Sequence, residues 1–334
     1  MGKICPEKLL ELVFPYQGKN RKEVIYNASL GRDCGVVDCD EDLIALTCDP
    51  ITGTSTHIGS FAVHVVANDL ICAGADPVGL LISIVLPHNS DESQIQLIMK
   101  DVDLTSKKIG IAVLGGHTEI SEVVHRTLIH CFGIGRVKRD NIPDVEKVQP
   151  GDSIIITKGV GIEGTAILAN LYHAQLSNQF GQSFVQKAQD FMTMLSIVPE
   201  GKIALKHAPH CLHDATEGGL LGALWEVCAG QNLGFIIQEQ SIPLRPETKT
   251  ICDFFQIDPL KLISSGTLII FTPHPEPLLE AFQKASIPGY LIGKITDSSD
   301  KILDLNNGKN ELIESCPQDE LWRIIEKSTD FTPF

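Results

Sequence analysis

One segment constrains the fold more than any other, the apolar stretch IGSFAVHVVANDLIC at residues 58–72. Its apolar side chains recur at helical spacing, and the sequence GADP that follows is typical of a helix end. We therefore expect a long helix with a buried face. The same segment carries Asn68 and Asp69, and a carboxylate inside an apolar helix costs free energy unless a partner or ligand compensates it. Asp69 is accordingly a candidate functional residue.

Strands and helices alternate on both sides of this segment. A short helix over 6–13 and strands over 24–28, 34–38 and 43–48 are expected before it. The strand GLLISIVLP, a helix over 91–109 and the strands IAVLGG and RTLIHCFGIG are expected after it. This order predicts an α+β layer with helices packed on one face of a sheet. The other face then needs a partner, which favours a homodimer.

The second half of the chain is also α/β in character, beginning with the strand and glycine loop DSIIITKGVGIEG. The polar segment RDNIPDVEKVQPGD at residues 139–152 contains two prolines and a glycine, which suits a passage between domains. We place the boundary near Gln149. The expected domains are residues 1–149 and 150–334.

Composition excludes several classes of protein. A chain of 334 residues that is 43% hydrophobic and 21% charged is typical of a globular enzyme of two domains. The formal net charge of -15, without clustered Lys and Arg, argues against nucleic-acid binding. No signal-type segment or apolar run of membrane-spanning length is visible, so we expect no membrane partner and a cytoplasmic location.

A strand that ends in two glycines leads into three side chains able to bind a charged ligand. In VLGGHTEIS, Gly115 and Gly116 precede His117, Thr118 and Glu119. Glycine permits close approach of a ligand to the backbone. The segment is therefore a candidate binding site for a nucleotide or a metal.

Acidic residues lie at the ends of several expected elements, and carboxylates from different loops can converge on Mg²⁺ and a nucleotide. Asp33 and Asp49 taken alone are equally well explained as turn residues. The full set of candidate acids is Asp33, Asp49, Asp69, Glu119, Asp214 and Glu217.

Two other patterns favour ordinary structural roles. The loop GVGIEG fits a dinucleotide-binding motif, but the stretch that follows lacks the second strand and its terminal acid, so a tight turn whose amides face an anion is the milder interpretation. In HAPHCLHD, the donors His207, His210, Cys211 and His213 could bind zinc, yet Pro209 and strand alternation argue against it. The 10 cysteines contain no CxxC pair and are expected to be mostly buried thiols.

The order of seven motifs resembles one known family. GRDCGVVD, LTCDPITG, IGSFAVHVVANDLICAGADP, GGHTEIS, GVGIEGTAIL, HDATEGGL and SSGTLII follow one another as in the aminoimidazole ribonucleotide (AIR) synthase superfamily. This superfamily includes thiamine monophosphate kinase, selenophosphate synthetase and the hydrogenase maturation protein HypE. The resemblance implies a two-domain AIR synthase (PurM)-like fold, whose N-terminal sheets pair across a dimer into a barrel, with ATP and Mg²⁺ as ligands.

The resemblance also implies roles for single residues. Asp33, Asp49 and Asp69 match acids expected near Mg²⁺, and Thr47 matches the hydroxyl beside them. Gly116 and His117 match the Gly-Asp that contacts nucleotide and metal in the kinases. In the second domain, the matching residues are Asp214, Thr216 and Glu217.

The resulting assignment has three parts. The catalytic candidates are His117, Asp214 and Glu217. The nucleotide-binding candidates are Thr47, Asn68, Gly115, Gly116, His117, Thr118, Arg136 and Thr216. The metal candidates are Asp33, Asp49, Asp69, Glu119 and Asp214, with Arg139 and Lys158 as further cations near the phosphates.

Two departures from the family pattern bear on function. His117 stands where the kinases have Asp, and because imidazole is a poor Mg²⁺ ligand, we expect it to face phosphate. The C-terminal STDFTPF has no cysteine, whereas HypE proteins end in the cysteine that carries the group being dehydrated.

We therefore expect ATP-dependent phosphoryl transfer to an oxygen of a small-molecule acceptor seated between the domains, achieved mainly by positioning and charge neutralisation. A HypE-like maturation factor and a non-catalytic nucleotide-binding protein are the alternatives. The identity of the acceptor stays open.

Overall fold

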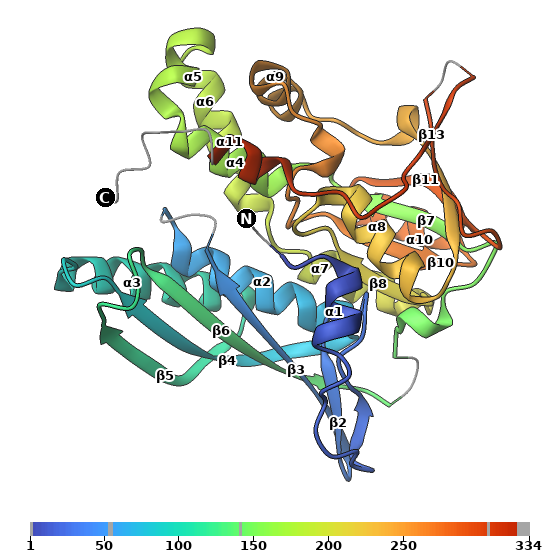
Figure 1. The fold of residues 1–334 in the computed structure, drawn as a ribbon, viewed down its shortest axis with the longest axis horizontal. Coiled ribbons are helices and arrows are strands. Elements are labelled where there is room, and N and C mark those ends of the chain that lie inside the picture. Colours follow the sequence, from blue (N-terminus) through green and yellow to red (C-terminus); the bar gives the residue numbers. More distant parts are fainter. Residues whose placement is uncertain (1–2, 53–55, 140–141, 306–307, 326–334) are drawn as a thin grey trace. The chain divides into compact units, whose positions relative to one another are not determined.

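The computed structural model describes residues 3–52, 56–139, 142–305 and 308–325, which form two compact units (Figure 1). The N-terminal unit contains residues 21–27 and 33–142. The C-terminal unit contains residues 3–20 and 28–32 together with the described chain from residue 143 onward. The division of the chain at Gln149 stays a prediction.

The N-terminal unit is a mixed sheet of six strands with two helices on one face. Along the chain its elements are β1 (Val24–Tyr26), β2 (Gly35–Cys39), β3 (Asp42–Ile51), α2 (Ile58–Cys72), β4 (Ala75–Leu86), α3 (Glu92–Ile109), β5 (Ala112–Ile120) and β6 (Leu128–Val137). The strand order is β1-β2-β3-β6-β4-β5, and only the β4–β5 pair is parallel.

Helix α2 is buried almost all round, because it packs on β3, β4 and β6 and also against α3. Ala62 and Ala67 are 0% exposed. Gly59 allows the close crossing of the two helices, since a Cβ there would lie 2.4 Å from the Ile98 carbonyl oxygen of α3. The predicted helix over 58–72 is confirmed at both ends.

Helix α3 has regular signals at both ends. The side chain of Asp91 accepts hydrogen bonds from the amides of Ser93 and Gln94 at the start of the helix. Gly110 ends it in the left-handed conformation, at φ 91°. These signals explain why its sequence-predicted limits agree with the structure.

The C-terminal unit is built on a mixed sheet of seven strands in the order β13-β12-β9-β11-β7-β10-β8. Its strands are β7 (Ser153–Thr157), β8 (Cys211–Asp214), β9 (Gly234–Gln238), β10 (Leu268–Thr272), β11 (Gly289–Thr296), β12 (Lys301–Asp304) and β13 (Asn310–Leu312). Ile154, Ile156 and Phe271 on its central strands are fully buried.

Helices surround this sheet. The α-helices are α1 (Pro6–Leu12), α4 (Ile162–Leu171), α5 (His173–Phe180), α6 (Gln182–Gln189), α7 (Val198–Ala204), α8 (Gly219–Gly230), α9 (Pro246–Phe255), α10 (Pro275–Lys284) and α11 (Glu320–Ile325). The 3-10 turns are η1 (Val145–Lys147), η2 (Asp190–Met194), η3 (Leu205–His207), η4 (Glu239–Ser241) and η5 (Pro259–Lys261).

The α+β fold class is confirmed, and the differences from the sequence prediction are local. Strand β3 continues past the predicted residue 48 to Ile51, because its pairing with β6 extends through Asp49 and Pro50. Helix α9 and the short elements β12, β13 and α11 were not predicted. No helix in the described part of the chain is both long and apolar enough to cross a membrane.

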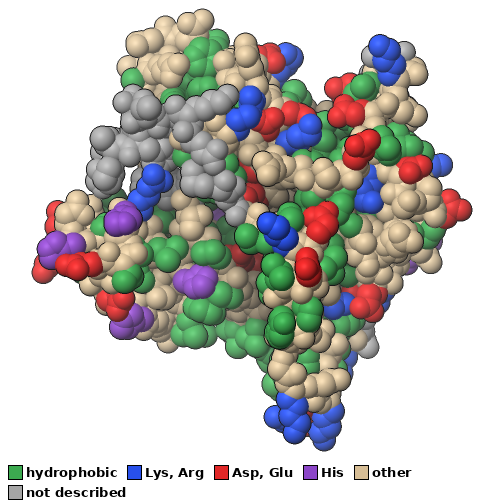
Figure 2. Space-filling view, viewed as in Figure 1, with side chains coloured by type: hydrophobic (Ala, Val, Ile, Leu, Met, Phe, Trp, Pro, Cys, Tyr) green, Lys and Arg blue, Asp and Glu red, His purple; other side chains and the backbone are tan. Residues whose placement is uncertain are grey.

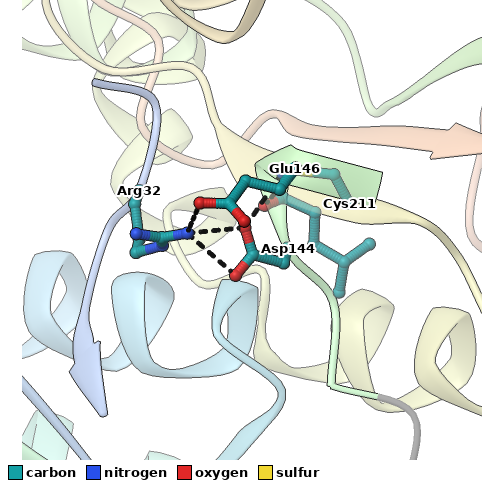
Figure 3. Close-up of polar contacts among 5 residues, drawn as sticks. Arg32, Asp144, Glu146 and Cys211 are labelled. Atoms are coloured by element: carbon teal, nitrogen blue, oxygen red, sulfur yellow. Dashed lines mark hydrogen bonds and ion pairs between the residues drawn. The ribbon is translucent and has the colours of Figure 1, made fainter. Parts of the chain in front are cut away.

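A buried ion pair holds the residue 28–32 segment to the residue 143–147 segment in the C-terminal unit (Figure 3). Arg32 Nη2 donates to both carboxylate oxygens of Asp144, at 2.9 and 3.0 Å, and to Glu146 Oε1 at 3.0 Å. The side chains of Arg32 and Asp144 are 10% and 3% exposed. Truncating one member therefore leaves a buried charge without its partner.

We predict that Arg32→Ala lowers the free energy of unfolding of the C-terminal unit by about 3 kcal/mol, because Asp144 stays buried and loses its counter-charge. The matched control is Lys249→Ala, which removes the exposed Lys249–Asp253 pair of α9 and should change stability by less than about 0.5 kcal/mol. Both tryptophans, Trp225 and Trp322, lie in this unit, so urea unfolding followed by tryptophan fluorescence measures it. Equal losses in the two variants would contradict the prediction.

Candidate functional site

The buried helix α2 brings a carboxylate against the sheet of the N-terminal unit. Asp69 is 7% exposed, and its Oδ2 accepts a hydrogen bond from Thr47 Oγ1 on β3 at 2.5 Å. Asn68, the preceding residue of α2, is 0% exposed. The sequence argument that Asp69 needs a compensating partner is thus met in part by the Thr47 hydroxyl.

The face of the sheet that carries this pair also carries other candidates. Because side chains alternate along a strand, Asp49 lies on the same face of β3 as Thr47. Pairing between β4 and β5 sets Gly116 opposite Ile82 and Thr118 opposite Ile84, and both isoleucines are buried on the helix-covered face. This face therefore offers hydroxyl and carboxylate oxygens, which are hard ligands.

His117 and Glu119 lie on the opposite, open face. His117 is opposite Ser83 on β4, and Ser83 is opposite His130 on β6, so these side chains share a face. His117 Nε2 and Glu119 Oε2 are 3.1 Å apart, with the two side chains 67% and 48% exposed. The register thus separates His117 and Glu119 from the Thr47–Asp69 pair.

The packing of β4 against β5 gives a structural reason for the two glycines of VLGGHTEIS. Gly116 has φ 153°, and a Cβ there would lie 1.8 Å from the carbonyl oxygen of Ile82 on β4. Gly115 has φ 155°, and a Cβ there would first meet Leu81 Cδ2, at 3.6 Å. The close approach of β4 to β5 therefore requires glycine at position 116 whether or not a ligand binds.

The three cationic candidates already have acidic or carbonyl partners. Arg136 and Arg139 form ion pairs with Asp42 and Asp38 at the β2–β3 hairpin. Lys158 is largely buried and donates to Met194 O, Ser196 O and Glu200 Oε1, at 2.7 to 2.8 Å. Burial lowers the pKa of Lys158. Through these contacts, Lys158 holds its loop to the η2–α7 segment.

The remaining candidates stand at two strand ends. Asp33 precedes β2 and is half-buried. Asp214 ends β8, where it pairs with Leu268 of β10 and is 2% exposed. Thr216 follows in the turn that leads into α8, and its carbonyl accepts a hydrogen bond from the amide of Gly219.

Glu217 joins three parts of the C-terminal unit. Its Oε1 accepts hydrogen bonds from the Lys3 amide at 2.6 Å and from Trp322 Nε1 at 2.8 Å. The N-terminal segment and helix α11 therefore meet at this carboxylate. In this arrangement Glu217 fixes its loop rather than standing free.

Two buried carboxyl groups near Glu217 were missed by sequence reasoning. Glu163 accepts a hydrogen bond from the Ser265 amide at 3.3 Å, and Asp319 accepts from the amides of Gly218 and Leu321, at 2.6 and 2.8 Å. Burial raises the pKa of each to about 7, and the mutual repulsion of Glu163, Asp319 and Glu217 adds to the shift. Glu163 lies inside the loop GVGIEG, but its burial depends on distant segments.

The glycine loop and the histidine cluster form polar contacts with other residues of the same unit. At the start of α4, the amides of Ile162 and Gly164 donate to Ser264 Oγ and Ile263 O. His210 Nδ1 lies 2.8 Å from the buried carboxylate of Asp152. Within the described chain, no three of His207, His210, Cys211 and His213 bring ligand atoms close enough together to hold an ion.

We predict that the free energy of unfolding of the C-terminal unit falls less with rising pH in Glu163→Gln than in wild type. The raised pKa means that the native state keeps the proton that the unfolded chain releases near pH 4.5. Stability from this group is therefore fully present below that pH and is lost as pH rises through about 7.

Between pH 4.5 and pH 8, wild type should lose about 3 kcal/mol more than Glu163→Gln, since one pKa unit corresponds to about 1.4 kcal/mol. Urea unfolding at several pH values measures this difference. Glu280→Gln, which alters an exposed carboxyl group on α10, is the control. A parallel pH dependence in wild type and Glu163→Gln would refute the assignment.

Comparisons with known proteins agree with the motif order. The family model for the AIR synthase related protein N-terminal domain matches residues 31–137, and that for the C-terminal domain matches residues 149–306. A protein of Methanocaldococcus jannaschii, provisionally named as a hydrogenase expression/formation protein, is 29% identical over 278 residues, covering 80% of this chain and 79% of the relative. The carbamoyl dehydratase HypE of Azotobacter vinelandii is 29% identical over 238 residues, covering 70% and 67%.

Solved structures share the fold. Hydrogenase maturation protein HypE in complex with ATP has a TM-score of 0.68 at 22% identity, covering 83% of this chain and 86% of that one. The thiamine monophosphate kinase homologue ThiL complexed with AMPPCP and TMP has a TM-score of 0.73 at 18% identity, covering 92% and 97%.

Among the alternatives raised by the sequence, the HypE-like one is better supported by these relatives than phosphorylation of a small molecule. The C-terminal segment that argued against it, residues 326–334, lies outside the described residues. Two family models matching most of the chain, in the order that the motifs predict, show that this protein belongs to the AIR synthase related family.

Proposed function

We propose that this protein is an ATP-dependent enzyme that transfers the γ-phosphoryl group of ATP to the oxygen of a carbamoyl group. The observation that carries the proposal is the Thr47–Asp69 pair, a carboxylate inside an almost wholly buried helix of a chain that is similar to HypE proteins. The relatives named carbamoyl dehydratase support the nature of the acceptor, and the HypE complex with ATP supports the nucleotide.

The residues of the N-terminal unit suit a magnesium–nucleotide ligand. Thr47, Asp49 and Asp69 present hard oxygen donors on one face of the sheet, and carboxylates with substrate phosphates are the usual ligands of Mg²⁺. We assign Mg²⁺ to Asp49 and Asp69, with Asp33 as the third acid, and the ATP phosphates to Thr47, Gly116 and Thr118. Bound Mg²⁺ would supply neutralisation of the phosphate charge.

The chemistry explains why ATP is needed to dehydrate a carbamoyl group. The carbamoyl oxygen attacks the γ-phosphorus and ADP leaves, which turns a poor leaving group into phosphate. Loss of that phosphate with the two N–H protons then converts the carboxamide carbon to a nitrile. The carboxamide oxygen ends in inorganic phosphate, so the elements of water are accounted for.

The C-terminal unit has a separate role in the proposal. Asp214 and Thr216 are assigned to the acceptor, and Asp214 is the candidate proton acceptor for the leaving N–H protons. Glu217 is assigned to holding this loop, through its contacts with Lys3 and Trp322. His117 and Glu119 lie on the open face of the N-terminal sheet. They are therefore candidates only for nucleotide contacts on that face.

We propose further that the active form is a homodimer joined through the open face of the N-terminal sheet. Leu46, Leu81 and Phe132 project from this face and are 46%, 47% and 41% exposed. Hydrophobic side chains gather over the region of β4 and β6 in Figure 2, with histidine among them. An exposed apolar sheet face of this kind favours burial against a partner.

We predict that Asp69→Asn lowers the rate of ATP-dependent ADP formation about 100-fold or more, because it removes a carboxylate assigned to Mg²⁺, and Mg²⁺ would neutralise the charge of the phosphates. Thr47→Val should lower it as well, whereas Thr47→Ser keeps the hydroxyl and most of the rate. Asp103→Asn, on the exposed side of α3, is the matched control. If Asp69→Asn folds and turns over like wild type, the site is wrong.

An oxygen-18 experiment separates the alternatives. The protein is incubated with ATP, Mg²⁺ and a cysteine peptide whose S-carbamoyl oxygen is ¹⁸O, and phosphate is analysed by mass spectrometry. Recovery of ¹⁸O in inorganic phosphate is the expected result. Unlabelled phosphate would mean simple ATP hydrolysis, a phosphorylated thiamine phosphate in a parallel assay would favour the kinase, and ATP binding without ADP would favour the nucleotide-binding protein.

A further inference from the structure

The open face of the N-terminal sheet carries a cysteine and a histidine in contact. Cys48 on β3 is exposed, His130 on β6 is half-buried, and Cys48 Sγ lies 3.7 Å from His130 Nε2. Register places them diagonally, since Cys48 is opposite Phe132 and Pro50 is opposite His130. The pair lies on the face opposite Thr47 and is separate from the magnesium–nucleotide site proposed above.

The spacing of the two ligand atoms fits a tetrahedral metal. Zinc bonds thiolate sulfur at about 2.3 Å and imidazole nitrogen at about 2.0 Å, so tetrahedral angles place these two atoms about 3.6 Å apart. The observed 3.7 Å, a hydrogen-bond contact in the metal-free pair, is close to that value.

Both ligands are also held in place. They project from strands of 10 residues each, which pair with one another from Leu43 to Ile51 on β3 and from Ile129 to Val137 on β6. The His130 ring packs edge-on against Phe132, with the ring centroids 5.3 Å apart. A ligand pair fixed by rigid strands loses little conformational freedom when a metal binds.

One chain supplies only half of a closed zinc site. In the described chain, no third His, Cys, Asp or Glu brings a ligand atom close enough to complete the pair. The nearby pair His117–Glu119 lies on β5, with β4 between it and β6. Among the described residues, the pair therefore lacks two of the four ligands of a closed site.

A second copy can provide them. In a two-fold symmetric interface the same patch meets itself, so a cysteine and a histidine from each copy give a donor set of two sulfurs and two nitrogens. That set is typical of structural zinc sites, and the apolar side chains around it would exclude water. Leu46 and Phe132 flank the pair on this face.

We propose that Cys48 and His130 of two copies bind one zinc ion at the centre of the interface. The proposal rests on the homodimer proposed above, but not on ATP or on catalysis. Nothing in the phosphoryl-transfer chemistry requires this metal, so its role is to fix the pairing of the two sheets.

The test uses the full chain, stripped of metal with a chelator and titrated with Zn²⁺ and, separately, Co²⁺. We expect one metal per two chains, and for Co²⁺ the strong visible bands of a tetrahedral site with a thiolate-to-metal absorption. Cys48→Ser and His130→Gln should each reduce bound metal to background. Cys39→Ser, which removes another exposed cysteine at the end of β2, should bind like wild type.

Light scattering on the same samples separates the two proposals. A wild-type dimer that binds no zinc, or binds it equally well as Cys48→Ser, would overturn the metal site while leaving the dimer. A monomer that binds one zinc per chain would overturn completion by a second copy. A monomer without zinc would overturn both, and ATP titration of that monomer would still test the proposed function.

Discussion

The burial of helix α2 is the constraint on which the N-terminal unit depends. A helix covered on nearly every side can carry a carboxylate only where a partner compensates it, and Thr47 on β3 provides one hydrogen bond to Asp69. The same packing fixes which face of the sheet Thr47 and Asp49 occupy. Cys48 and His130 lie on the other face of the sheet, which α2 does not cover.

In the C-terminal unit, the loop that follows β8 holds several distant segments together. Glu217 receives the Lys3 amide and the Trp322 indole, and Asp319 receives the Gly218 amide. Segments from both ends of the described chain thus converge on one turn. Burial raises the pKa of both Glu163 and Asp319, and the neighbouring negative charges add to that rise.

Much of the fold follows from local sequence. Helix α2 has its limits set by apolar periodicity and by GADP, and α3 has its limits set by Asp91 and Gly110. The polar sequence from residue 172 to residue 208 indicates helical structure, but without strong end signals it does not define the limits of α5, α6, α7 and the two 3-10 turns. Sequence reasoning also missed α11, a helix of 6 residues that depends on packing.

The sequence by itself determined the family, the order of the longer elements of the N-terminal unit and the types of ligand atom available, because motifs and periodicity are properties of short segments. Only the tertiary structure decided which of those atoms can meet. His117 follows Gly116 directly, yet strand alternation and the register of β4 with β5 turn their positions to opposite faces. Glu163 and Asp319 lie far apart in the sequence, yet the fold brings Asp319 close enough to affect the pKa of Glu163. Alternation and long-range pairing are physical consequences of the assembled sheets, and no short segment contains them.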